Sequence, residues 1–123
     1  MTTREIGYCG EEAAAEYLRR LGYEIVETNY TVRGGEIDII ALCENTLVFA
    51  EVKSRRKGNS SAAEAVDGTK LSRIVRSAER YVAEKKQAAE EMKLRFDCIE
   101  VYFENSTGDI KTEINQIKNI DVT

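Results

Sequence analysis

Three charged residues interrupt two apolar segments in the first half of the chain, and their types could support metal-dependent hydrolysis. Asp38 lies within "EIDIIAL", while Glu51 and Lys53 end "TLVFAEVK". Both segments have the composition of β-strands, and a two-residue connection predicts an antiparallel hairpin. Alternate side chains share a face, so Glu51 and Lys53 project together, with Cα atoms about 6–7 Å apart. The short connection brings Asp38 close to Glu51.

The chemistry follows from the charges. Two carboxylates brought together in a partly desolvated region repel each other and resist ionisation, and a divalent cation removes that penalty. Carboxylate and water oxygens are the ligands that Mg²⁺ prefers. A lysine beside the metal can orient a water molecule or neutralise charge on a phosphate. The pattern is compatible with a metal site and with a surface ion pair, and the residues alone favour the ion pair.

The Glu-x-Lys triplet is a weak signal by itself. It occurs three times, at 51–53, 84–86 and 91–93. The second and third copies fall in a charged helical stretch, where solvated side chains are expected. The first copy differs because it ends an apolar strand and has an Asp on the preceding strand.

The elements that must position these residues can be read from hydrophobic periodicity. Helical spacing of apolar residues, including Leu21, predicts a helix over 3–21 that ends at Gly22, and a second from Thr69 to about Gln87. Alternating or continuous apolar runs predict strands. The predicted strands are 23–30, 36–42, 46–53, 94–103 and 110–117; turns are predicted at 31–35, 44–45 and 105–109, a loop at 54–62 and a short helical turn at 64–67.

Interleaved helices and strands predict an α/β fold, in which helices cover both faces of one mixed sheet. The first three strands form an antiparallel meander, and the fourth pairs in parallel after the second helix. A length of 123 residues suits a single domain, 1–123. We expect a cytoplasmic protein without a membrane segment, because no apolar run could span a bilayer and no signal peptide is evident.

The amino-acid composition excludes several kinds of catalytic site. The chain has no histidine, which excludes Ser-His-Asp hydrolysis, Cys-His dyads and HExxH zinc sites. Its three cysteines, Cys9, Cys43 and Cys98, are too far apart in sequence for a metal knuckle and are expected to be small buried hydrophobes. Carboxylates, lysine, a hydroxyl or a metal must therefore carry any catalysis.

Several segments in order resemble the bacterial family of small YraN-like proteins, UPF0102. They are "GEEAAAEYLRRLGYEIVETNY", "RGGEIDIIA", "LVFAEVKSRR" and "AVDGTKLSRI", within Gly10 to Phe103. That family is similar in turn to restriction-endonuclease-like nucleases, with archaeal Holliday junction resolvases nearest in size and layout. The resemblance implies a three-layer restriction-endonuclease-like fold, with a central mixed sheet flanked by helices.

The resemblance also assigns roles. The PD-(D/E)XK motif of those nucleases is an Asp on one strand and (Asp/Glu)-x-Lys on the next, matched here by Asp38, Glu51 and Lys53. Resolvases carry a helical Glu, which Glu11 matches. The resemblance implies Mg²⁺ or Mn²⁺ held by Asp38 and Glu51, with Glu11 and the Val52 carbonyl as further ligands and Lys53 assisting the attacking water. The proline that often precedes the Asp is replaced by Ile37.

Basic residues suggest a surface for nucleic acid despite a net charge of −4. One side of the predicted second helix carries Lys70, Arg73, Arg76 and Arg80. Further basic residues flank the two site strands: Arg33, Arg55, Arg56 and Lys57. A solvated helix face remains the alternative. Tyr30 and Tyr81 are the only aromatic residues near this surface, so single-strand stacking is not indicated.

Three functions remain open at this stage. The first is a metal-dependent DNA endonuclease, acting on branched or structured DNA and expected by resemblance to be a homodimer. The second is a nuclease-like fold that binds nucleic acid or protein without cutting. The third is a structural domain in which the charges form an internal salt bridge. The resemblance favours the first.

Overall fold

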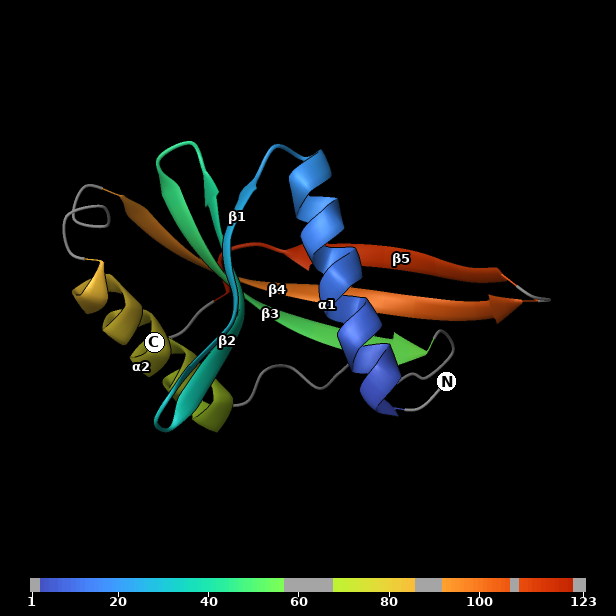
Figure 1. Ribbon diagram of the computed structural model, residues 1–123, viewed down its shortest axis with the longest axis horizontal. Coiled ribbons are helices and arrows are strands. Elements are labelled where there is room, and N and C mark those ends of the chain that lie inside the picture. Colours follow the sequence, from blue (N-terminus) through green and yellow to red (C-terminus); the bar gives the residue numbers. More distant parts are fainter. Residues whose placement is uncertain (1–2, 57–67, 86–91, 107–108, 121–123) are drawn as a thin grey trace.

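Two helices and five strands follow one another in the order that the sequence predicts (Figure 1). The computed structural model describes residues 3–56, 68–85, 92–106 and 109–120. The elements are α1 (Thr3–Arg20), β1 (Glu24–Val32), β2 (Gly35–Cys43), β3 (Thr46–Arg56), α2 (Gly68–Glu84), β4 (Lys93–Ser106) and β5 (Asp109–Ile117). The α/β class is confirmed, and the arrangement is compatible with a three-layer nuclease-like fold.

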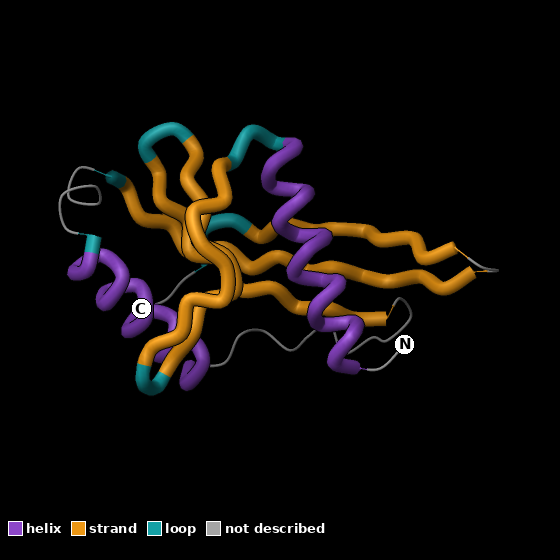
Figure 2. The backbone as a smooth tube through the Cα atoms, viewed as in Figure 1, coloured by secondary structure: helices purple, strands orange, loops and turns teal. Residues whose placement is uncertain are grey.

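The sheet has the strand order β1-β2-β3-β4-β5 (Figure 2). Neighbouring strands are antiparallel except β3 and β4, which pair in parallel from Thr46 opposite Lys93 to Arg56 opposite Phe103. The connection between these two strands includes α2, as a parallel crossover requires. The predicted meander and the predicted parallel pairing are both confirmed.

Each helix covers one face of the sheet. On the α1 side of the core, the small residues Ala14 and Ala15 and the aliphatic Leu18 let the helix approach the strands closely. The α2 side is more aromatic, with Tyr81 edge-on to both Tyr30 and Phe49. Tyr30 and Tyr81 are therefore core residues, and their sequence-based placement near a nucleic-acid surface is wrong.

The helix α1 ends before Gly22, the residue that the sequence predicts as its C-terminal glycine. Gly22 has a φ of +95°, a conformation that glycine adopts without steric cost. The N–H of Tyr23 donates to the Leu18 carbonyl at 2.9 Å, and the N–H of Gly22 donates to the Arg19 carbonyl at 3.0 Å. This is the hydrogen-bond pattern of a Schellman motif. It turns the chain sharply into β1 and buries Tyr23 under the helix.

Several strands are longer than the sequence predicts. β1 continues through Thr31 and Val32, which pair with β2, so the turn is only Arg33–Gly34. Residues 54–56 belong to β3 rather than to the predicted loop, because β4 continues alongside and supplies backbone partners as far as Phe103. Residues 105, 106 and 109 extend β4 and β5 into the predicted turn. The rest of the predicted loop and the helical turn at 64–67 lie outside the described residues.

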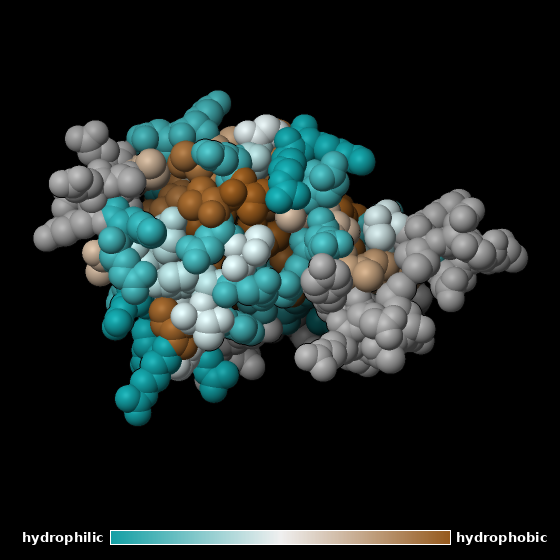
Figure 3. Space-filling view, in the orientation of Figure 1, coloured by the Kyte–Doolittle hydropathy of each residue, from teal (hydrophilic) through white to brown (hydrophobic). Residues whose placement is uncertain are grey.

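The surface is mostly hydrophilic on the face shown in Figure 3, with an apolar area over the strands beside α1. Leu21 is 52% exposed, so its predicted place in the apolar stripe of the first helix is wrong. The Schellman turn carries this residue past the last packed turn of the helix. Cys98 is buried and Cys9 and Cys43 are partly buried, in line with the prediction. No helix in the described ranges is long and apolar enough to cross a membrane.

Candidate functional site

The candidate site lies where the backbone pairing of β2 and β3 stops. The two strands pair from Cys43 opposite Thr46 to Ile39 opposite Ala50, and the next position in this register places Asp38 across from Glu51. Both side chains are buried, with 8% and 6% of their residue surface exposed. The Asp38 Oδ2 accepts a hydrogen bond of 2.8 Å from the Val52 N–H. A side-chain acceptor thus replaces the backbone carbonyl that a continuing ladder would supply.

The alternation of side chains in β2 is interrupted at this point. Ile37 and Ile40 pack in the same cluster on the α2 side, although residues three apart in a regular strand face opposite sides. On the neighbouring strand, Asn29 has a φ of 53° and lies between two positions that pair normally with Ile39 and Ile37. The sequence predicts that Asp38 shares a face of the sheet with Ile40 and Leu42. That prediction assumes regular alternation of side chains, which β2 does not keep at this point.

Burial makes Asp38 an unusual carboxyl group. Its pKa is raised from 3.8 to about 6, chiefly because burial disfavours the charged form, and the negative charges of Glu11 and Glu36 add to the rise. Hydrogen bonds from the Val52 N–H and from the Glu51 carboxyl group act in the opposite direction. A hydrogen bond between two carboxyl groups requires a proton on one of them. Two buried carboxyl groups therefore lie side by side, and a bound cation would offset the repulsion between their charged forms.

This raised pKa predicts that stability falls as pH rises. Between pH 4 and 6 the folded protein retains the Asp38 proton, which the unfolded chain releases near pH 3.8. We expect this group to lower the free energy of unfolding by about 2–3 kcal/mol across that window, with no further change above pH 7. Urea denaturation at several pH values, in the absence of divalent cations, measures the slope. Asp38→Asn should flatten it, and an unchanged slope in that variant would contradict the assignment.

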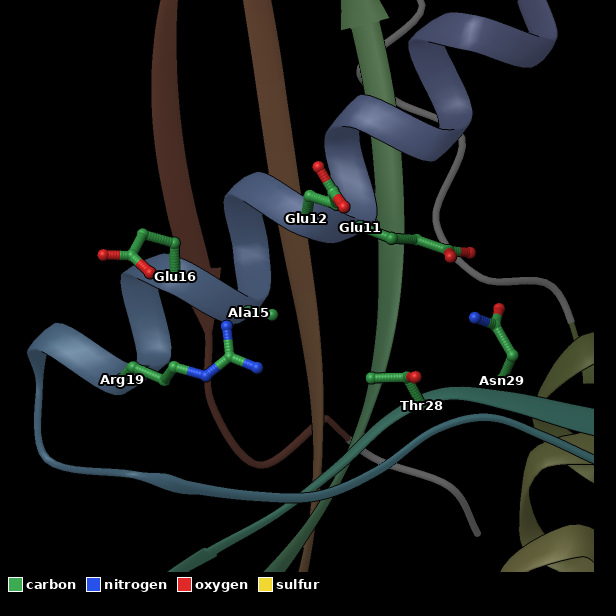
Figure 4. Close-up of a pocket in the computed structure, with 7 residues that line it drawn as sticks. All are labelled: Glu11, Glu12, Ala15, Glu16, Arg19, Thr28 and Asn29. Carbon is green, nitrogen blue, oxygen red and sulfur yellow. The ribbon is translucent and has the colours of Figure 1, made fainter.

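Glu11 approaches the pair from α1. It is half-buried, its charge raises the Asp38 pKa, and it lines a pocket of about 480 Å³ between α1 and β1. Figure 4 shows its carboxylate extending toward Asn29 on β1, while Glu12, its exposed neighbour, points elsewhere. The charge of Glu11 therefore reaches Asp38, but Glu11, Asp38 and Glu51 do not form a three-carboxylate group that could hold a metal ion.

Lys53 lies two residues beyond Glu51 on β3 and is half-buried. Its partner in the parallel ladder is Glu100 on β4. The Glu100 carboxylate accepts hydrogen bonds from the Tyr102 hydroxyl at 3.0 Å and the Asn115 side-chain amide at 2.8 Å. These contacts fix a buried carboxylate opposite the lysine. Glu100 interrupts the apolar run "CIEVYF" as Asp38 interrupts "EIDIIAL", so the same sequence signal could have identified it.

The basic residues predicted to contact nucleic acid separate into two places. Arg33 is exposed in the β1–β2 turn, and Arg73 and Arg76 are exposed on α2, which packs against β1 and β2. The Arg76 guanidinium lies against Gly34, and the Arg73 backbone lies against Gly35. Arg33, Arg73 and Arg76, hereafter the hairpin-tip arginines, therefore gather about 10 Å along β2 from Asp38.

The other predicted basic contacts differ from this group. Arg55 is half-buried on β3 opposite Tyr102. Burial and the hydrogen bond to Glu100 raise the pKa of Tyr102, and the charge of Arg55 opposes that rise. Arg80 forms an exposed ion pair with Glu84 at 3.3 Å. Arg56 and Lys70 lie in β3 and α2, but their side chains, like the whole of Lys57, are outside the described residues.

Asp38 and Glu51 are the buried carboxylates of this site, and carboxylates are of the ligand type that binds a magnesium ion. In the parts of the chain that the structure describes, no group of three or more Asp, Glu or Cys side chains could by itself hold a metal ion. Mg²⁺ is usually bound by one or two carboxylates and keeps several waters. Asp38 and Glu51 would supply the carboxylates, the Val52 carbonyl one further oxygen, and Glu11 a partner for bound water.

Comparison with known proteins finds relatives of this chain that share one family description. Residues 10–101 match the model of the uncharacterised protein family UPF0102. A UPF0102 protein of Caldicellulosiruptor saccharolyticus is 43% identical over 120 residues, covering 97% of this chain and 98% of that protein. A UPF0102 protein of Alkaliphilus oremlandii is 39% identical over 117 residues, covering 94% and 97%. The range matched by the family model, residues 10–101, contains every residue of the candidate site.

Proposed function

We propose a function for this chain from the premise that it belongs to the uncharacterised protein family UPF0102: it is a metal-dependent endonuclease that hydrolyses phosphodiester bonds in branched or otherwise structured DNA. The observation that carries the proposal is the buried Asp38–Glu51 pair, with Lys53 on the same strand as Glu51. A cation bound at these two neighbouring buried carboxyl groups would offset their mutual repulsion.

The chemistry divides among the residues of the site. A bound Mg²⁺ or Mn²⁺ would lower the pKa of a coordinated water and offset the charge of the phosphate. Asp38 and Glu51 hold that position, and their burial keeps bulk water from weakening the interaction. Lys53 donates hydrogen bonds to the attacking water or to a phosphate oxygen. Glu100 is the neighbour of Lys53 in the parallel ladder.

A DNA substrate is supported by the distribution of charge. The hairpin-tip arginines present positive charge near one end of the site, although the chain as a whole is acidic. Phosphate contacts of this kind position a nucleic acid without reading its sequence. Recognition of DNA shape therefore fits the surface better than recognition of bases.

Cleavage with Mg²⁺ or Mn²⁺ is the direct test. The protein is incubated with duplex, single-stranded, flap and four-way DNA, and products are resolved on denaturing gels. We expect Lys53→Ala to reduce the cleavage rate at least about 100-fold, because it removes a donor that acts on the developing charge. Lys85→Ala is a matched control, since Lys85 belongs to another Glu-x-Lys triplet but is exposed at the end of α2.

Two outcomes would contradict the proposal. Cleavage that survives Lys53→Ala unchanged indicates a contaminating nuclease. DNA binding without turnover in either cation indicates a nuclease-like fold that binds without cutting. Metal binding is checked separately by thermal denaturation, because a cation at about 100 times its Kd stabilises the folded state by about 2.7 kcal/mol.

A further inference from the structure

We propose that the carboxamide of Asn29 binds a phosphate oxygen of the DNA strand that enters the site, from the side opposite Lys53. This inference rests on the proposed function, since it assumes a nucleic-acid ligand. It assigns to β1 a substrate contact that the sequence did not indicate. The motivation is the combination of a pocket, a left-handed residue within a strand, and an amide that the fold itself does not use.

The position of Asn29 is set by the register of β1 and β2. Thr28 pairs with Ile39 and Tyr30 pairs with Ile37, so Asn29 lies beside Asp38. Its φ of 53° is the left-handed conformation, which non-glycine residues rarely adopt, and never as part of a regular strand. Asparagine tolerates this conformation better than most side chains do. The irregular backbone therefore directs an asparagine toward the pocket instead of into the strand alternation.

The pocket shows what Asn29 faces. It has a volume of about 480 Å³ and is lined by residues of α1 and β1: Glu11, Glu12, Ala15, Glu16, Arg19, Thr28 and Asn29. In Figure 4 the Asn29 carboxamide and the Glu11 carboxylate point toward each other across an open space. The carboxylates can only accept hydrogen bonds when ionised, so the donors in this pocket for a phosphate oxygen are the side chains of Arg19, Thr28 and Asn29. Asn29 supplies two N–H groups without adding charge.

The fold does not use this carboxamide. Asn29 is exposed, and among the described residues its side chain makes no hydrogen bond; only its backbone carbonyl is engaged, by the Thr31 hydroxyl at 3.3 Å. A glycine would adopt the same φ with less strain. Its position is also suitable, because Asn29 lies beside Asp38 on β1, the edge strand of the sheet. A DNA backbone that enters the site across this edge would pass Asn29.

The test separates binding from folding. Asn29→Gly removes the amide and keeps the backbone conformation, and Glu44→Gly is the matched control, because Glu44 is an exposed residue with a φ of 54° in the β2–β3 turn. Affinity for four-way and duplex DNA is measured by fluorescence anisotropy with Ca²⁺ in place of Mg²⁺. We expect Asn29→Gly to weaken binding about tenfold, with an equal or higher Tm, and Glu44→Gly to leave affinity unchanged.

A second variant distinguishes a phosphate contact from a structural role. Asn29→Asp keeps the shape and tolerates the same φ but brings a negative charge toward phosphate, so it should bind DNA more weakly than Asn29→Gly. Wild-type affinity in Asn29→Gly, or equal affinity of the Asp and Gly variants, overturns the inference. If the unsubstituted protein binds DNA without cutting it, the endonuclease proposal fails while the affinities still decide the role of Asn29. If it binds no DNA, both fail.

Discussion

Asp38→Asn should abolish Mg²⁺-dependent cleavage and, at pH 8, raise the free energy of unfolding by about 2 kcal/mol. Both effects have one cause. At that pH the Asp38 carboxylate is charged in a buried position beside Glu51 and Glu11, which is why its pKa is raised to about 6. An amide removes the charge, still accepts from the Val52 N–H, and can donate to Glu51. It also removes a carboxylate that the metal requires.

The measurement combines urea denaturation at pH 8 without divalent cations and the cleavage assay with Mg²⁺. A loss of stability in Asp38→Asn would favour a structural salt bridge, which was one of the readings that the sequence left open. Retained cleavage would show that the metal is held elsewhere. Asp97→Asn is the matched control, because it changes the same kind of residue at another buried position and should have the opposite effect on stability.

Asp97→Ala should lower the free energy of unfolding by about 3–5 kcal/mol, the loss typical of breaking a buried ion pair. Asp97 is fully buried on β4, and its two oxygens accept four hydrogen bonds from three residues. Arg95 donates to both at 2.9 Å, the Gln116 amide donates to Oδ2 at 2.9 Å, and the Asn119 N–H donates to Oδ1 at 3.0 Å. The hydrogen bonds from Arg95 to Asp97 raise the pKa of the guanidinium, which stays charged.

Removal of this carboxylate leaves several donors unsatisfied. Arg95 also donates to the Tyr23 hydroxyl at 2.7 Å, so the network joins β4, β5 and the turn that follows α1. Urea denaturation at pH 7 gives the change in free energy, and Arg20→Ala is the control, because it breaks only the exposed pair with Glu16. That control should change stability by about 0.5 kcal/mol or less. An equally small loss for Asp97→Ala would contradict the structural role.

The parts of the fold that sequence could predict are those with a local cause. Apolar periodicity located every helix and strand, and Gly22 marked the end of α1. The short turn before β3 placed Asp38 near Glu51, because this relation depends on fewer than twenty residues of chain.

The features of the fold that sequence could not predict depend on residues far apart in the chain, or on a backbone conformation that the residue type allows but does not require. The partners of Asp97 come from residues 2 to 22 positions away, and those of Arg95 include Tyr23, 72 positions away. Asparagine allows a left-handed φ but does not require it, so "ETNYTV" reads as a regular strand although Asn29 departs from one. The exposure of Leu21 likewise depends on how the turn after α1 is made.

The parallel ladder between β3 and β4 has a consequence for the order of folding. It joins residues 47 positions apart, such as Thr46 and Lys93, whereas every other strand pair is closed by a short connection. Closing so long a loop is entropically unfavourable and slow, so the β1–β2–β3 meander and the β4–β5 hairpin can form before they join. Asp38, Glu51 and Lys53 all belong to the first unit. Their approach is therefore encoded in the early-forming part of the chain.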